Sequence, residues 1–146
     1  MVDDVVVGSS VDDDRLPQLM ELYRSTWWAK DRGVAEVAKM VAGSDLVVTL
    51  VRQSDDRLVG FARVLTDFTF IGLVLDVVVA PDVRGLRLGA RLMDAIVGNP
   101  ELAAVQSLEL VCQPELEEFY ARWGFSAQVG RSRLMRRTDE SRLLHA

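Results

Sequence analysis

The spacing of apolar residues predicts which parts of the chain form helices. Residues 11–25 and 34–45 each carry apolar side chains at the spacing of one helix face. These side chains are Leu16, Leu19, Met20 and Tyr23 in the first segment and Val34, Val37, Ala38 and Val41 in the second. Aspartates open the first segment, where the helix dipole favours them, and Gly43 provides a stop for the second. The pattern therefore predicts two consecutive helices.

The pattern then changes to that of β-strands. Residues 45–53 and 57–67 are rich in β-branched side chains, and the segment between them, Ser-Asp-Asp, has the composition of a hairpin turn. Residues 71–79 are apolar almost without interruption, as expected of a strand that is buried on both faces. We therefore expect three consecutive strands in the middle of the chain.

The second half of the chain alternates between the two patterns. It predicts a helix over residues 88–97, a strand over 107–112, a helix over 114–124 and a last strand over about 128–135. With a first strand near Val5, the order is one strand, two helices, three strands, helix, strand, helix, strand. This order predicts an α/β fold.

Composition indicates a single globular domain over residues 1–146. The chain has 146 residues, of which 49% are hydrophobic and 27% charged, enough to bury a core. Order is expected to weaken before Val5 and after about Thr138, so that residues 139–146 form a polar tail.

Charge and rare residues exclude several kinds of partner. A net charge of −5 argues against nucleic acid. One cysteine, Cys112, cannot form an intrachain disulfide, and one histidine, His145, does not make a metal site. The first residues are acidic rather than basic, and no apolar run reaches membrane-spanning length. We expect a cytoplasmic protein with no membrane partner.

Candidate chemistry lies where the buried strand turns into the helix at residue 88. The first N–H groups of a helix have no partner inside the helix and attract anions. Glycines at 85 and 89 allow close approach of a ligand, and Arg84, Arg87 and Arg91 suit phosphate. The alternative is an ordinary turn with solvated arginines. Neither a P-loop nor a dinucleotide-binding glycine motif is present.

The combination resembles the GNAT superfamily of acyl-CoA-dependent N-acetyltransferases. Its loop pattern, R/Q-x-x-G-x-G/A, is matched by Arg84 and Gly89, whereas Arg87 replaces the usual glycine. A helical backbone at Arg87 would tolerate this side chain. The later segment "FYARWGF" is similar to the family's aromatic helix end. The resemblance implies a GNAT fold, a twisted mixed sheet flanked by about four helices, with acetyl-CoA as cosubstrate.

The resemblance also implies a set of cofactor-binding residues. They are Val77, Val78, Val79, Arg84, Gly85, Leu86, Arg87, Leu88, Gly89, Ala90 and Gln113. Backbone groups of residues 77–79 would be exposed to the pantetheine arm where their strand splays from the next, and one N–H would bind the oxyanion.

Two side chains are candidates for catalysis. Tyr120 matches the tyrosine that protonates the leaving thiolate in many relatives, or it is a core residue in a stripe with Leu116, Phe119 and Trp123. Asp76 would be costly to bury unless it acts as a base or pairs with an arginine such as Arg63. Glu117 is a weaker candidate base. Many members of the family deprotonate the amine through ordered water, which requires no dedicated base.

The acceptor side is expected to come from the two N-terminal helices and the hairpin. The candidate substrate-binding residues are Trp27, Trp28, Arg32, Arg63 and Asp67. Either tryptophan could instead close the core, and Cys112 is more consistent with a small buried hydrophobe than with a carrier of acetyl groups.

These features predict direct transfer of an acetyl group to a primary amine of a small molecule or peptide. A non-catalytic acyl-CoA sensor and a protein-interaction domain are the alternatives, and a homodimer is left open.

Overall fold

The computed structural model describes residues 4–145. Its first compact unit ends at Val111 and its second begins at Cys112. The elements of the first unit are β1 (Val5–Gly8), α1 (Leu16–Arg24), α2 (Val34–Gly43), β2 (Leu46–Arg52), β3 (Arg57–Thr66), β4 (Ile71–Val79), the 3₁₀ turn η2 (Pro81–Val83), α3 (Leu88–Val97), η3 (Pro100–Leu102) and β5 (Ser107–Leu110). Those of the second are η4 (Pro114–Leu116), α4 (Glu117–Ala121) and α5 (Arg142–His145).

The first unit is built on one mixed sheet with the strand order β1-β2-β3-β4-β5. Strands β1 to β4 pair antiparallel with their neighbours, and β5 pairs parallel with β4. A parallel pair needs a crossover connection, which α3 supplies between β4 and β5. The predicted α/β fold with a mixed sheet is confirmed.

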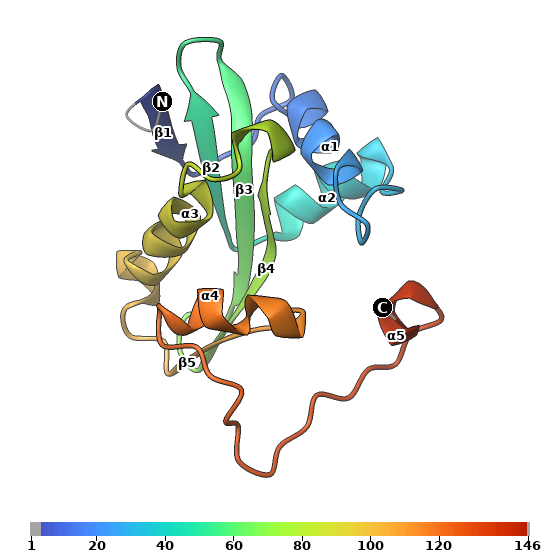
Figure 1. Cartoon of the computed structure of the whole chain (residues 1–146), viewed down its shortest axis with the longest axis vertical. Helices are drawn as coiled ribbons and strands as arrows, with labels where there is room; N and C mark the ends of the chain where they lie inside the picture. The colour runs from blue at the N-terminus through green and yellow to red at the C-terminus, as the bar shows by residue number, and fades with distance from the viewer. Residues whose placement is uncertain (1–3, 146) are drawn as a thin grey trace. The chain divides into compact units, whose positions relative to one another are not determined.

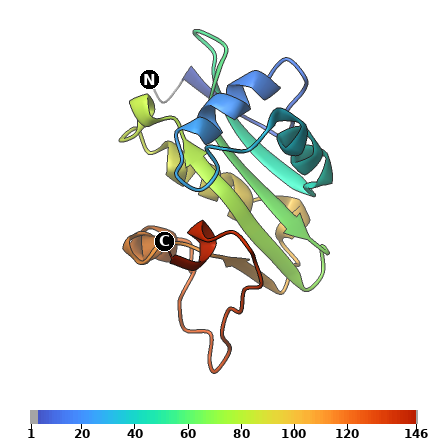
Figure 2. The same cartoon turned by 90° about the vertical axis from the view of Figure 1, so that its right-hand side faces the viewer.

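Helices cover both faces of this sheet (Figures 1 and 2). Helices α1 and α2 lie on one face and α3 lies on the other. The apolar stripe predicted for the first helix is buried at Leu19 and Tyr23, and α3 buries Leu92 and Ile96. No helix among residues 4–145 is long and apolar enough to cross a membrane.

The strand predicted over residues 128–135 is wrong. In the second unit these residues are irregular, and Val129, Leu134 and Met135 are exposed. A short segment forms a strand only where the edge of a neighbouring strand pairs with its backbone. The end of the predicted polar tail instead forms one helical turn, α5.

Candidate active site

The junction between β4 and α3 is a tight turn that presents a helix N-terminus. Gly85 has a φ of +93° and Arg87 a φ of +61°, and together they turn the chain into α3. The first helical hydrogen bond runs from the N–H of Arg91 to the carbonyl oxygen of Arg87, at 3.2 Å. The N–H groups of residues 88–90 precede that bond and are available to an anion.

The arginines of the loop differ in what they contact. Arg84 and Arg87 are exposed, and neither forms an ion pair with any residue in the described part of the chain. Arg91 instead donates to the carbonyl oxygen of Val5 at 2.8 Å, so it joins α3 to β1. Two uncommitted guanidinium groups beside free N–H groups fit the pyrophosphate of CoA.

The backbone at Arg87 corrects one expectation. Its φ of +61° and ψ of +26° are left-handed rather than helical. A glycine adopts these angles freely, whereas a side chain there costs about 1–2 kcal/mol. The arginine at position 87, where the family usually has glycine, therefore strains the loop.

Within the described part of the chain, no strand pairs with the β5 side of β4 beyond Val74, where the thioester is expected. Pairing of β4 with β5 ends at Val74 and Leu110, and β4 continues to Val79. The N–H of Ala80 donates to the carbonyl oxygen of Val59 on β3 at 2.9 Å. Because neighbouring residues of a strand point their N–H groups to opposite edges, the N–H of Val79 faces the open edge.

Asp76 lies at a bulge in the middle of β4. Its φ is +55°, and the register between β3 and β4 shifts between Phe61 and Arg63 at this point. The bulge turns the carboxylate toward the helices α1 and α2, where Oδ2 accepts three hydrogen bonds. The donors are Arg32 Nη1 at 2.7 Å, Arg63 Nε at 2.8 Å and Tyr23 Oη at 3.0 Å.

This environment determines the charge of Asp76. Burial alone would raise its pKa, but hydrogen bonds from Arg32 and Arg63 outweigh burial and lower the pKa below its usual value. Burial, together with the charge of Asp76, raises the pKa of Tyr23. Asp76 is therefore an ionised, paired carboxylate, which is a poor base. The pairing with Arg63 that the sequence suggested is present.

Arg32 is held in place by aromatic rings as well as by Asp76. Its guanidinium lies 4.9 Å from the ring centroid of Tyr23 and 5.5 Å from that of Trp28. Trp28 also meets Tyr23 edge-on, with centroids 6.1 Å apart. The predicted residues Trp28, Arg32 and Arg63 are thus brought together with Asp76. Tyr23 was missed as a site residue, although a tyrosine on an apolar helix face signals a hydroxyl that needs a partner.

Two predicted substrate residues lie outside this cluster. Trp27 is exposed. Asp67 lies in the turn between β3 and β4, where Oδ1 accepts N–H donors from residues 69–71 at 2.8–3.0 Å. These bonds lower the pKa of Asp67 and occupy its carboxylate in holding the turn. A substrate role for either residue stays a prediction.

Tyr120 belongs to the second unit and is buried on α4. Phe119 and Phe125 meet its ring edge-on, with centroid distances of 4.9 Å and 6.3 Å. Burial raises the pKa of Tyr120 to about 12. The same unit contains Gln113, at the start of η4, and a half-buried Cys112, whose pKa burial also raises.

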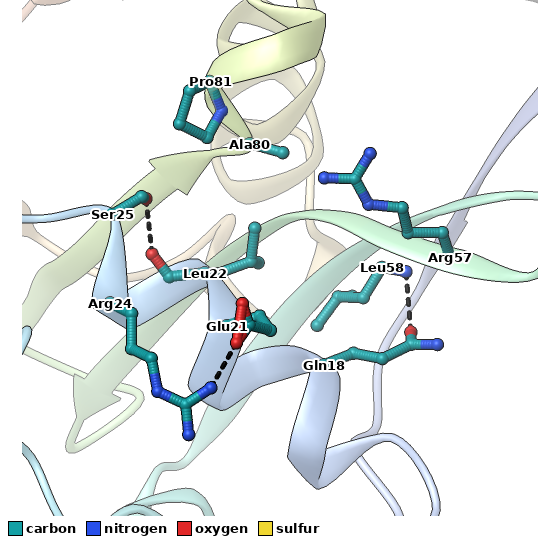
Figure 3. A pocket seen from close by; sticks show the side chains of 9 residues that line it. All are labelled: Gln18, Glu21, Leu22, Arg24, Ser25, Arg57, Leu58, Ala80 and Pro81. Carbon is teal, nitrogen blue, oxygen red and sulfur yellow. Dashed lines mark hydrogen bonds and ion pairs between the residues drawn. The ribbon is translucent and has the colours of Figure 1, made fainter.

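A pocket of about 490 Å³ opens between α1, the start of β3 and the end of β4 (Figure 3). Its lining residues are Gln18, Glu21, Leu22, Arg24, Ser25, Arg57, Leu58, Ala80 and Pro81. Gln18 supports one wall by accepting the N–H of Leu58 at 2.8 Å. None of the predicted site residues lines this pocket, so it adjoins the loop rather than marking the site of reaction.

A sequence profile described as an acetyltransferase (GNAT) domain matches residues 45–127, more than half of the chain. The chain belongs to the GNAT family. It is 33% identical over 112 residues to the uncharacterized N-acetyltransferase ycf52 of Porphyra purpurea, a match that covers 75% of this chain and 64% of that protein. This GNAT chain thus spans less than two thirds of its curated relative.

Two further comparisons show how the GNAT chain relates to named proteins. A 73-residue match at 37% identity to serotonin N-acetyltransferase 2 of Oryza sativa covers 50% of this chain and 36% of that protein. The crystal structure of a protein of the GNAT family from Xanthomonas campestris is 32% identical, with a TM-score of 0.76, and the match covers 91% of this chain and 93% of that one. The similarity in fold thus extends over most of the GNAT chain.

Proposed function

We propose that this chain transfers an acetyl group from acetyl-CoA directly to a primary amine of a small molecule or peptide. The observation that carries the proposal is the open edge of β4, which leads into a helix N-terminus beside two uncommitted arginines. The N-terminus of α3, with Arg84 and Arg87, would hold the pyrophosphate. The edge at Val79 would hold the acyl end of the cosubstrate.

The reaction exchanges one bond to the acetyl carbon for another. The unprotonated amine attacks the thioester carbonyl, the C–S bond breaks, and the thiolate and a proton become CoA thiol. A backbone donor at the carbonyl oxygen stabilises the charge that develops there. The N–H of Val79 is our candidate, because the strand directs it away from β3.

We assign the two proton transfers of the reaction, protonation of the leaving thiolate and deprotonation of the amine, to Tyr120 and to water. Burial raises the pKa of Tyr120 to about 12, so its hydroxyl is protonated at neutral pH and carries a proton that it can donate. Asp76 is an unsuitable base because its arginine partners stabilise the carboxylate. We therefore assign deprotonation of the amine to ordered water, and treat Asp76 as a residue that positions Arg32 and Arg63.

The test begins with the cosubstrate. Acetyl-CoA at millimolar concentration should raise the melting temperature, because a ligand that binds only the native state stabilises it. Gly89→Val should fold but lose this shift, since a branched side chain would block the approach of a phosphate to the helix N-terminus. Gly43→Val, at the end of α2, is a matched control, because an added Cβ there meets no atom within 4 Å. An equal shift in Gly89→Val would contradict the loop assignment.

Turnover is measured next, by release of CoA thiol with a panel of amines that includes serotonin, a histone tail peptide and free amino acids. Thiol release that depends on an amine supports the enzyme. A thermal shift without release from any amine would support the alternative, a non-catalytic acyl-CoA sensor.

A further inference from the structure

The cluster around Asp76 contains more positive than negative charge. Its ionised groups are the guanidinium groups of Arg32 and Arg63 and the carboxylate of Asp76. The side chain of Asp76 is 6% exposed, that of Arg63 is 13% exposed and that of Arg32 is 31% exposed. Among residues 4–145, one positive charge of this partly buried cluster is therefore left without a counterion, which favours the binding of an anion there.

Several donors of the cluster are unused. Arg63 donates to Asp76 through Nε, and its two Nη atoms form no hydrogen bond with any of residues 4–145. Arg32 uses only Nη1, which donates to Asp76 and to the sulfur of Met40. Within the same described residues, its Nε and Nη2 have no hydrogen-bond acceptor. The remaining donors form part of two forks of the kind that bind a carboxylate.

The unused hydrogen-bond donors of Arg32 and Arg63 lie near the place where we expect the amine substrate to bind. Asp76 lies three residues before Val79 on β4, and the edge at Val79 is where we propose that the acyl end of the cosubstrate is held. The cluster lies on the face of β4 that α1 and α2 cover, and the ring stacking of Arg32 on Tyr23 and Trp28 holds its charge there before any ligand arrives. A group bound by these arginines would sit next to the amine that is acetylated.

We propose that the acceptor amine carries a carboxylate, which Arg32 and Arg63 bind. This inference rests on the proposed acetyl transfer. A single carboxylate neutralises the surplus charge of the cluster, whereas a phosphate dianion would leave one negative charge in excess. Small amino acids are therefore preferred over neutral amines as the substrate class.

The experiment compares acids with their own amides. β-Alanine, γ-aminobutyrate, L-alanine and L-lysine are each assayed against the corresponding carboxamide, with serotonin as a neutral amine. Rates are expressed per unprotonated amine, which corrects for different amine pKa values within a pair. We expect at least one acid to exceed its amide in kcat/KM by about 10- to 100-fold, the range for losing one charged hydrogen-bonded contact.

Variants of the arginines test whether Arg32 causes the preference for acids over amides. Arg32→Gln should bring the acid-to-amide ratio close to one, and Arg32→Lys, which keeps the charge, should retain part of it. Arg52→Gln removes an arginine paired with Asp55 at the far end of the hairpin and should leave the ratio unchanged. The ratio is measured within each protein, so it does not depend on the fraction that is folded.

Three results would overturn the inference. They are an acid-to-amide ratio near one in the wild type, a preference for serotonin over every acid, or an unchanged ratio in Arg32→Gln. Each of these leaves acetyl transfer itself intact. If no amine releases thiol although acetyl-CoA binds, the proposed function fails, and the inference fails with it.

Discussion

Arg57, the first residue of β3, binds the carboxylate of Asp82 in η2 through two hydrogen bonds of 2.6 Å and 2.8 Å. The pair ties the first turn of the candidate phosphate loop to the sheet. The hydrogen bonds from Arg57 lower the pKa of Asp82 to about 2, so the pair is fully charged at neutral pH. An exposed pair of this kind contributes little to global stability, but it fixes the start of the loop.

Asp82→Asn should therefore weaken acetyl-CoA binding while changing the melting temperature little. Calorimetric titration of each variant with acetyl-CoA measures the dissociation constant. Asp55→Asn is the matched control, because Asp55 forms a similar exposed pair with Arg52 in the turn between β2 and β3. Equal dissociation constants for Asp82→Asn and the wild type would show that this pair does not position the loop.

Asp76→Asn should destabilise the fold by about 3–5 kcal/mol, because it leaves two arginines without their buried counterion. Denaturant unfolding measures the change. If Asp76 is instead the catalytic base, turnover would collapse while the unfolding free energy stays near that of the wild type.

The lowered pKa of Asp76 predicts how the stability of the fold depends on pH. The folded-state pKa of Asp76 is lowered from 3.8, so its stabilising contribution is present above that value and disappears as pH falls through the folded pKa. The stability difference between wild type and Asp76→Asn should thus be constant from pH 5 to neutrality and shrink in stronger acid. Unfolding curves at several pH values test this, and a difference that grows in acid would contradict it.

Arg87→Gly should raise stability by up to about 1 kcal/mol, because glycine adopts the left-handed backbone at this position without strain. Gly85→Ala, where φ is +93°, should have the opposite effect. Melting temperatures of both variants, with and without acetyl-CoA, separate loop strain from the loss of the Arg87 charge. A destabilised Arg87→Gly would mean that the side chain contributes more than its strained backbone costs.

Tyr120→Phe keeps the ring that packs against Phe119 and Phe125 and removes only the hydroxyl. If Tyr120 is the general acid, kcat should fall by up to about 10²- to 10⁴-fold, less if water protonates the thiolate, while the melting temperature changes little. The raised pKa, about 12, also predicts no loss of activity from Tyr120 ionisation below about pH 10. Equal kcat values in the two proteins would remove Tyr120 from the mechanism.

The order of elements through β5 could be read from the sequence because each depends on local signals. The period of apolar residues, the glycine that ends α2 and the polar turn between β2 and β3 act over a few residues. The segment 128–135 shows the limit of such signals. A strand was predicted there, but a strand forms only with a partner, and pairing is not a local property.

The candidate site also combines features that local sequence signals reveal with features that depend on the folded structure. The loop at Arg84 and Gly89 was recognisable because its chemistry lies in consecutive residues. The left-handed backbone of Arg87 could not be recognised from the sequence, because an arginine does not indicate a left-handed turn. The contact between Arg32 and Asp76 joins residues that are 44 positions apart, so only the packing of the α1–α2 loop on β4 brings them together.

Asp76 combines two demands that few amino acids can meet at once, which restricts substitution at this position. The left-handed backbone favours glycine, asparagine and aspartate, and the arginines require a short anionic side chain. Glycine and asparagine satisfy the backbone without the charge, while glutamate supplies the charge on a longer side chain that is less suited to the backbone. In a saturation library scored for folding, position 76 should therefore retain aspartate far more strictly than the valines that follow it.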